Sequence, residues 1–313
     1  MNYLALGWML IVVATATWVL SNVLIVLFSP LLRRASTPRT RGHLWVMASL
    51  PWVLPLLVIV TLLFLALAKS QGWIHHHCET HLAHHPHFCL EHLPTFALHL
   101  SGSLSGMFIV MCSFCLIVVR SVPIWQLQAK SRTFQRLVQG KSLRNTLDDE
   151  RPLAFALGGW KPSIFISKGL RELLSPKEMR IVVSHEVAHV RHKDVNKNAL
   201  FEMLLTLHAF PRLLRSSWNL TSELRADRYV AQKFDALEVA DVLLKLRRAT
   251  THSPFPTSIH GGQLSERIDA LIHDKHSRRS PISIHLIYFF LMVFPCLIVF
   301  SHHSLETLLG WLI

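Results

Sequence analysis

The chain has 313 residues, of which 51% are hydrophobic and only 16% are charged, and its formal net charge at pH 7 is +13. This length and composition allow one soluble domain together with several membrane spans. Acidic residues are mixed with the basic ones, which excludes a disordered tail of one charge. The sequence contains no nucleic-acid-binding motif, so we expect the basic residues to face an anionic membrane surface, without direct nucleic-acid binding.

Four apolar stretches predict membrane-spanning helices. Residues 4–27 and 44–67 are almost free of charge. Each is about 24 residues long, enough to cross a hydrocarbon core of ~30 Å. Residues 96–119 are interrupted only by His99 and small residues, and residues 284–300 are shorter but strongly apolar. The first stretch is too long for a cleaved signal peptide and lacks the basic region that precedes one.

Basic residues predict the orientation of these spans. Arg33 and Arg34 follow the first span, with Arg39 and Arg41 close behind, so this loop is expected in the cytoplasm. The N-terminus then lies outside the membrane. The predicted layout is three spans within residues 1–119, joined by a cytoplasmic loop at 33–43 and an external loop at 69–95, then a cytoplasmic domain at 120–283, a fourth span at 284–300 and an external tail at 301–313.

The predicted external loop is rich in histidine. Residues 75–92 contain eight His and two Cys, a density with no packing rationale and typical of a metal-binding tract. Copper, zinc and nickel all suit these ligands, and a pH-responsive loop or an inert polar loop are the alternatives. The cysteines are either ligands or a disulfide pair. The predicted metal-sensing residues are His75, His76, His77, Cys78, His81, His84, His85, His87, Cys89 and His92.

The cytoplasmic segment alternates between helical and strand patterns. Residues 123–149 read as mostly helical, and residues 153–157 and 163–167 predict a β-hairpin. Helices are then expected at 196–215, through Glu223 to about Phe234, from the Asp235 cap to about Arg248, and at 264–273.

The most informative motif is His185-Glu186-Val187-Ala188-His189. Ser175-Pro176-Lys177-Glu178 predicts the start of the helix that carries it, with a Ser cap, Pro in the first turn and a capping box. Histidines four residues apart project from one helix face, so both imidazoles can bind one metal ion, and the Glu between them can deprotonate a water. The alternative is a pair of core histidines in a chain with 21 His.

A second acidic motif favours the metal-site interpretation. Glu223 can supply the third ligand from a later helix. Asp227 lies one turn further along the same face, where it can accept a hydrogen bond from a ligand histidine, although it could equally be a solvated helix acid.

These residues resemble those of a known family. His185-Glu186-x-x-His189 with Asp194, followed by Glu223-x-x-x-Asp227, is similar to the gluzincin pattern of BlaR/MecR-type membrane metallopeptidases and of the related HtpX-like proteases. The resemblance implies an integral membrane α-helical protein of the bacterial inner (cytoplasmic) membrane with a cytoplasmic α+β gluzincin metallopeptidase domain.

The resemblance also implies a mechanism. Zn²⁺ would be bound by His185, His189 and Glu223, with Glu186 as the catalytic base in peptide hydrolysis. Asp227 and Asp194 would lie behind the ligands and orient them through hydrogen bonds. The oxyanion-stabilising residue is one of His192, Arg228 and Tyr229. An extended substrate would add to an open strand edge, for which residues 163–167 are the candidate unless that strand is internal.

The expected function is a signal-transducing protease. The chain extends only 13 residues beyond the fourth predicted span and contains no Ser-x-x-Lys, so β-lactam sensing through a penicillin-binding domain is not expected. We therefore predict metal sensing by the histidine loop, with cleavage of a BlaI/CopY-like repressor. The alternatives are an HtpX-like quality-control protease and a non-enzymatic membrane metal-binding protein. The sequence leaves a homodimer open.

Overall fold

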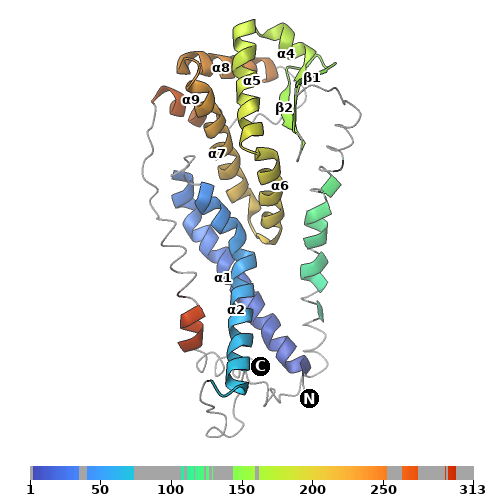
Figure 1. The fold of residues 1–313 in the computed structure, drawn as a ribbon, viewed down its shortest axis with the longest axis vertical. Helices are drawn as coiled ribbons and strands as arrows, with labels where there is room; N and C mark the ends of the chain where they lie inside the picture. The colour runs from blue at the N-terminus through green and yellow to red at the C-terminus, as the bar shows by residue number, and fades with distance from the viewer. Residues whose placement is uncertain are drawn as a thin grey trace.

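The computed structural model describes residues 3–34, 41–73, 144–158, 162–251 and 263–273, with short pieces between 107 and 129 and between 293 and 300. Within these residues the protein is mostly helical and elongated (Figure 1). Helices α1 (Tyr3–Arg34) and α2 (Arg41–Ser70) occupy one end, and a small sheet with the helices α4 to α9 occupies the other.

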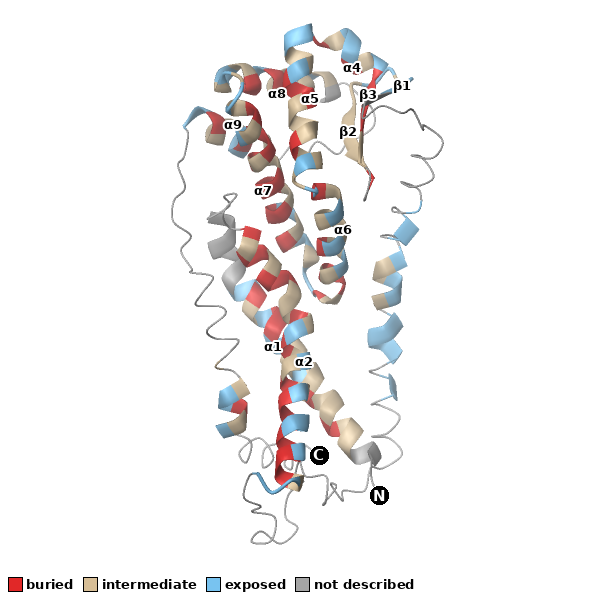
Figure 2. Cartoon of the chain, in the orientation of Figure 1, coloured by how far each residue is buried: buried red, intermediate tan, exposed pale blue. Residues whose placement is uncertain are grey.

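Helices α1 and α2 form an antiparallel pair, and both are long and apolar enough to cross a membrane. The apolar segment of α1 is Leu6–Leu27, and that of α2 is the whole helix. One face of α2 leaves large apolar side chains exposed, among them Leu56, Val60 and Phe64 (Figure 2). Lipid is the solvent that suits such a face.

The two other predicted spans stay predictions. Residues 96–119 and 284–300 lie only partly within the described residues, and a shorter apolar helix, Met111–Val122, runs through part of the first. The histidine-rich loop and the C-terminal tail lie outside the described residues altogether.

A three-stranded sheet covers one side of helix α5 (Pro176–Arg191), which carries His185 and His189. Strands β1 (Arg144–Leu147), β2 (Ala154–Leu157) and β3 (Ser163–Ser167) lie in the order β1-β3-β2. The predicted hairpin is confirmed, since β2 pairs antiparallel with β3.

The sequence did not predict the first strand of this sheet, and it left open whether residues 163–167 are an inner strand. β1 lies within the segment 123–149 that we predicted to be mostly helical, and it pairs in parallel with β3. Its sequence, Arg-Asn-Thr-Leu, has no apolar alternation, so long-range pairing rather than local pattern makes it a strand. β3 is the inner strand, with Ile164, Phe165 and Ile166 buried, so it offers no open edge.

Helix α5 (Pro176–Arg191) carries the two motif histidines and begins as predicted. Ser175 Oγ accepts a hydrogen bond from Glu178 N, and Glu178 Oε2 accepts one from Ser175 N at 2.7 Å, which completes the capping box. The short helix α4 (Lys168–Leu173) precedes it. A Cβ on Gly169 would lie 1.7 Å from the carbonyl oxygen of Glu150, so only glycine fits there.

The segment after α5 corrects another expectation. Instead of one helix over 196–215, the chain forms α6 (Asp194–Leu204), a 3-10 turn η2 (Leu205–Leu207) and then α7 (Pro211–Ala231). Pro211 occupies the first turn of α7, where its missing N–H is tolerated. The leucines on both sides conceal the turn, although Pro211 in the sequence marks the start of the second helix.

Helices α8 (Ala236–Thr251) and α9 (Leu264–Ile272) complete the domain and confirm the two predicted C-terminal helices. Three clusters of buried apolar residues are present among the described residues, one of them between α1 and α2 around Met9, Val13, Val58 and Leu62, and the other two in or beside the domain. Of these two, one joins the sheet to α5, α7, α8 and α9 through residues such as Ile166, Ile181 and Val230. The other joins α2 to α6 and α7 around Phe201 and Trp218, so the apolar helix pair and the domain share packed side chains.

Candidate metal centre

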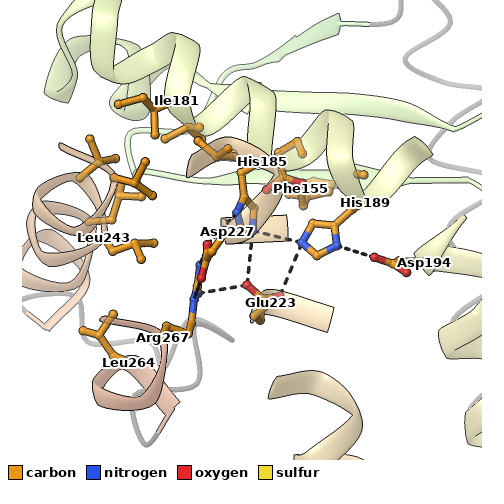
Figure 3. A pocket seen from close by; sticks show the side chains of 18 of the residues that line it. Phe155, Ile181, His185, His189, Asp194, Glu223, Asp227, Leu243, Leu264 and Arg267 are labelled. Atoms are coloured by element: carbon orange, nitrogen blue, oxygen red, sulfur yellow. Dashed lines mark hydrogen bonds and ion pairs between the residues drawn. The ribbon is translucent and has the colours of Figure 1, made fainter. Parts of the chain in front are cut away.

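Two helices bring three metal-binding side chains to one point. His185 and His189 project from one face of α5, and their Nε2 atoms lie 3.1 Å apart. Glu223 comes from the middle of α7, with Oε2 3.3 Å from His185 Nε2 and Oε1 3.6 Å from His189 Nε2 (Figure 3).

The donor set fits zinc. Four ligands around Zn²⁺ at 2.0–2.1 Å place neighbouring donor atoms about 3.3 Å apart in a tetrahedron. The two Nε2 atoms lie 3.1 Å apart, and each lies 3.3 or 3.6 Å from one of the two oxygens of the Glu223 carboxylate, distances close to that value. In the part of the chain that the structure describes, His185, His189 and Glu223 form the group that could hold a metal ion. Two imidazoles and one carboxylate leave a fourth position for water or substrate.

The Nδ1 atom of each of the two histidines pairs with a carboxylate. Asp227 Oδ1 lies 3.1 Å from His185 Nδ1, and Asp194 Oδ2 lies 2.9 Å from His189 Nδ1. Both aspartates are almost completely buried. Each carboxylate therefore fixes its imidazole as the tautomer with the proton on Nδ1, which leaves the Nε2 lone pair directed at the metal position.

Sequence reasoning missed the role of Arg267. This buried residue of α9 binds Asp227 in a bidentate pair, with both N–O distances at 2.7 Å, and its Nη1 lies 3.0 Å from Glu223 Oε2. Arg267 therefore orients Glu223, a candidate ligand, and Asp227, the carboxylate that pairs with the candidate ligand His185 (Figure 3). The stretch Ser265-Glu266-Arg267-Ile268 was visible in the sequence, but nothing in it indicated which carboxylates the arginine would reach.

These contacts shift the protonation equilibria of the site. Burial alone would lower the pKa of His185, but the hydrogen bonds with Asp227 and Glu223 raise it to about 10, so metal binding has to displace the proton from Nε2 of this imidazole. Burial would raise the pKa of Glu223, yet His185 and Arg267 hold it well below its usual range. The carboxylates therefore stay ionised at neutral pH, as metal binding requires.

Glu186 lines the same cavity, which has a volume of about 420 Å³. Burial raises the pKa of its carboxyl group, and the two neighbouring histidines oppose that shift. The backbone N–H of Ala156 in β2 hydrogen-bonds to this carboxylate, so the outer strand and the candidate base are in direct contact. Pro152, Ala154 and Phe155 line the cavity on the same side.

The three residues considered for the oxyanion lie elsewhere. His192 caps the end of α5, Arg228 is exposed on α7, and Tyr229 Oη accepts a hydrogen bond from Lys233. None of the three is among the residues that line the cavity, so their assignment gains no support from its geometry. The ten residues of the histidine-rich tract lie outside the described residues.

Two histidines on one helix, a glutamate from the next long helix, a second glutamate between the histidines and an adjacent strand form the arrangement expected of an HExxH metallopeptidase with a glutamate as third ligand. Comparison with known proteins agrees with this class. Residues 128–251, which contain all four of these side chains, match the model of peptidase family M48.

Curated relatives point the same way. A protease HtpX homolog of Thermoplasma acidophilum is 37% identical over 67 residues, which cover 21% of this chain and 19% of that protein. Protease HtpX homologs of Burkholderia mallei and Burkholderia pseudomallei are 33% identical over 78 residues, covering 22% of this chain and 27% of theirs. The chain thus spans about a fifth to a quarter of the length of these relatives.

Together with the two apolar helices, these matches support a membrane metalloprotease with an M48 peptidase domain. These matches support the resemblance to HtpX-like proteases that the sequence motifs indicated. The BlaR/MecR assignment stays a prediction.

Proposed function

We propose that this protein is a zinc-dependent endopeptidase of the membrane, in which His185, His189 and Glu223 hold the ion. The observation that carries the proposal is the convergence of these three side chains in a cavity that also contains Glu186. When bound there, zinc supplies a Lewis acid that polarises the scissile carbonyl and lowers the pKa of water.

The chain's own residues supply the remaining steps. Glu186 takes a proton from the attacking water and passes it to the departing amine nitrogen. Its raised pKa suits a group that must both accept and release a proton near neutral pH. Asp194 and Asp227 keep the two imidazoles in the metal-binding tautomer, while Arg267 balances the negative charge of Glu223 and Asp227.

Substrate binding would use β2. Among the described strands, β2 pairs only with β3, and its residues Ala154, Phe155 and Ala156 line the cavity. An extended peptide can add to such an edge through main-chain hydrogen bonds, which would place its scissile bond beside Glu186. The role that we first considered for residues 163–167 passes to β2, because β3 is internal.

The test compares the purified wild-type chain with Glu186→Gln on an unfolded model protein such as casein, with and without a zinc chelator. We expect the substitution to lower the cleavage rate at least 100-fold, the lower end of the effect of a general base, while zinc content is unchanged. A Glu186→Gln variant that cleaves at the wild-type rate would contradict the peptidase assignment and favour the non-enzymatic metal-binding alternative.

Two biological roles fit such a protease. The names of the matched relatives favour an HtpX-like quality-control protease. The histidine-rich tract at 75–92 favours a transducer in which external copper, zinc or nickel binding activates cleavage of a BlaI/CopY-like repressor. We infer the second role, because quality control by itself gives no reason for eight histidines in 18 residues.

Cells given copper, zinc or nickel salts distinguish the two roles. The transducer predicts metal-dependent loss of a repressor, abolished both by Glu186→Gln and by replacing the eight tract histidines with glutamine. A quality-control protease predicts degradation of damaged membrane proteins that is insensitive to the histidine replacements. Blotting for the repressor and for a misfolded membrane protein reads out both.

A further inference from the structure

The turn between α6 and α7 is built against the apolar helices. Trp52 of α2 donates a hydrogen bond from Nε1 to the carbonyl of Leu204 at 2.9 Å, and Trp18 of α1 donates one to Leu207 at 2.8 Å. Asn22 Oδ1 accepts one from Ala209 N at 2.8 Å. These contacts tie residues 204–209 to α1 and α2 side by side (Figure 1).

The same contacts fix the position of the α6–α7 turn along α1 and α2. Asp194, at the start of α6, lies 3.4 Å from Arg41, at the start of α2, and Leu204 at its end meets Trp52. α6 therefore runs alongside the first turns of α2, and its tip lies about 16 Å from the start of that helix. Trp18 and Trp52 both lie within the apolar segments of their helices, and the part of α2 that follows Trp52, residues 53–70, is still about 27 Å long, enough for most of a hydrocarbon core.

The backbone of the turn is satisfied without water. The carbonyls of Thr206 and His208 accept hydrogen bonds from Arg120 Nη1 at 3.2 and 2.6 Å, and the carbonyl of Leu205 accepts one from His208 N. With the two tryptophan bonds, every carbonyl from Leu204 to His208 has a partner in the protein. Irregular backbone at membrane depth is tolerated only when it is paired in this way.

The outward face of this hairpin changes from polar to apolar toward its tip. Lys193 and Asn196 are exposed near the start of α6, followed at helical spacing by Leu200 and Met203, and then by Phe210 in the turn. The last three are 51%, 50% and 60% exposed. A soluble turn has no reason to expose three large apolar side chains within residues 200–210.

Charged residues limit how deep the α6–α7 turn can lie in a membrane. Arg212 is exposed one residue after Pro211, and Arg215 pairs with Glu202 at 2.5–2.6 Å. An arginine can extend to lipid headgroups while its neighbours contact acyl chains, and tryptophan is typical of the same level. The position that accommodates all of these residues is the boundary between headgroups and acyl chains.

We propose that the α6–α7 turn is a membrane-inserted hairpin, with Leu200, Met203 and Phe210 among the acyl chains of the leaflet that surrounds α1 and α2 and Arg212 at its anionic headgroups. The inference is independent of proteolytic activity. It holds the metal centre about one α6 length, roughly 16 Å, from the lipid boundary, so it predicts that substrate segments reach the site close to the membrane surface.

The test measures depth in lipid. The full chain, with its five cysteines replaced by serine, receives a single cysteine at Met203 or Phe210, is labelled with the fluorophore NBD and is reconstituted into phosphatidylcholine–phosphatidylglycerol vesicles. Lipids with a quencher at carbon 5 or carbon 12 of the acyl chain report depth. We expect blue-shifted emission at both positions, and stronger quenching by the carbon-5 lipid.

Matched controls come from side chains with similar exposure. Leu237 of α8 is 58% exposed and should show no quenching, whereas Phe64 of α2, 56% exposed, should be quenched more by the carbon-12 lipid. Labels at Met203 and Phe210 that behave like the label at Leu237 would overturn the proposal, and so would quenching as deep as that at Phe64. Leu200→Cys provides a third position if either variant fails to fold.

Discussion

Arg41, the first residue of an apolar helix that could cross a membrane, lies 3.4 Å from Asp194, the carboxylate that holds His189 at 2.9 Å. Asp194 also pairs with Arg225 of α7. One buried carboxylate thus connects the start of α2, the helix of Glu223 and a candidate metal ligand. Movement of α2 relative to α7 would shift Asp194 and with it the imidazole of His189. This gives a physical connection between the membrane helices and the metal centre.

Asp194→Asn should weaken zinc binding about 10- to 100-fold, the range found when a ligand histidine loses its carboxylate partner. Arg41→Gln should have a smaller effect, because Arg225 still pairs with Asp194. Competition with a chelating dye measures both affinities. The exposed Arg212→Gln serves as the control, and an Asp194→Asn variant with wild-type affinity would exclude the proposed orienting role.

Arg267→Ala should destabilise the protein by about 3 kcal/mol or more, because it leaves two carboxylates in a buried site without their cation. Arg267→Lys should recover only part of this, since an ammonium group cannot form the bidentate pair with Asp227. Thermal unfolding in detergent measures the loss, with exposed Arg180→Ala of α5 as the matched control. Equal stability of the two alanine variants would refute the proposed stabilising role of Arg267.

Glu178→Gln tests the charge at the start of α5 without removing the cap. Hydrogen bonds from Lys245 and from Ser175 N lower the pKa of Glu178, so its contribution to stability is present above the unfolded-state pKa and is lost as the pH falls through the folded-state pKa. Glutamine keeps the hydrogen bond to Ser175 but loses the ion pair.

The expected loss is about 0.5–1 kcal/mol at pH 7, typical of a partly exposed pair, and it should shrink as the pH falls below about 4.3, the ordinary pKa of a glutamate. Unfolding midpoints measured from pH 3 to pH 8 follow the difference. A destabilisation that is the same at both ends of this range would rule out the electrostatic explanation.

The features that could be predicted from the sequence are local. Ser175 and Glu178 form the expected capping box, the hairpin of β2 and β3 is where turn residues indicated it, and His185 and His189 share a helix face because their spacing requires it. Glu223 was also within reach of sequence reasoning, since an acidic residue on a later helix is the expected third ligand of such a pair.

The features that escaped prediction depend on contacts between distant residues. β1 is a strand only because it pairs with β3, and the break at residues 205–210 is set by Trp18, Asn22 and Trp52, which lie more than 150 residues earlier in the chain. Arg267 reaches Asp227 across 40 positions. No periodicity within a window of the sequence contains that information.

Zinc content tests the central claim most directly. The purified full chain and its variants would be dialysed against a weak chelator and analysed by mass spectrometry. We expect the wild type and Glu186→Gln to hold one more zinc ion per chain than His189→Ala and Glu223→Ala, while His192→Ala, a histidine outside the cavity, matches the wild type. Equal zinc in the wild type and in both ligand variants would contradict the metal centre at His185, His189 and Glu223.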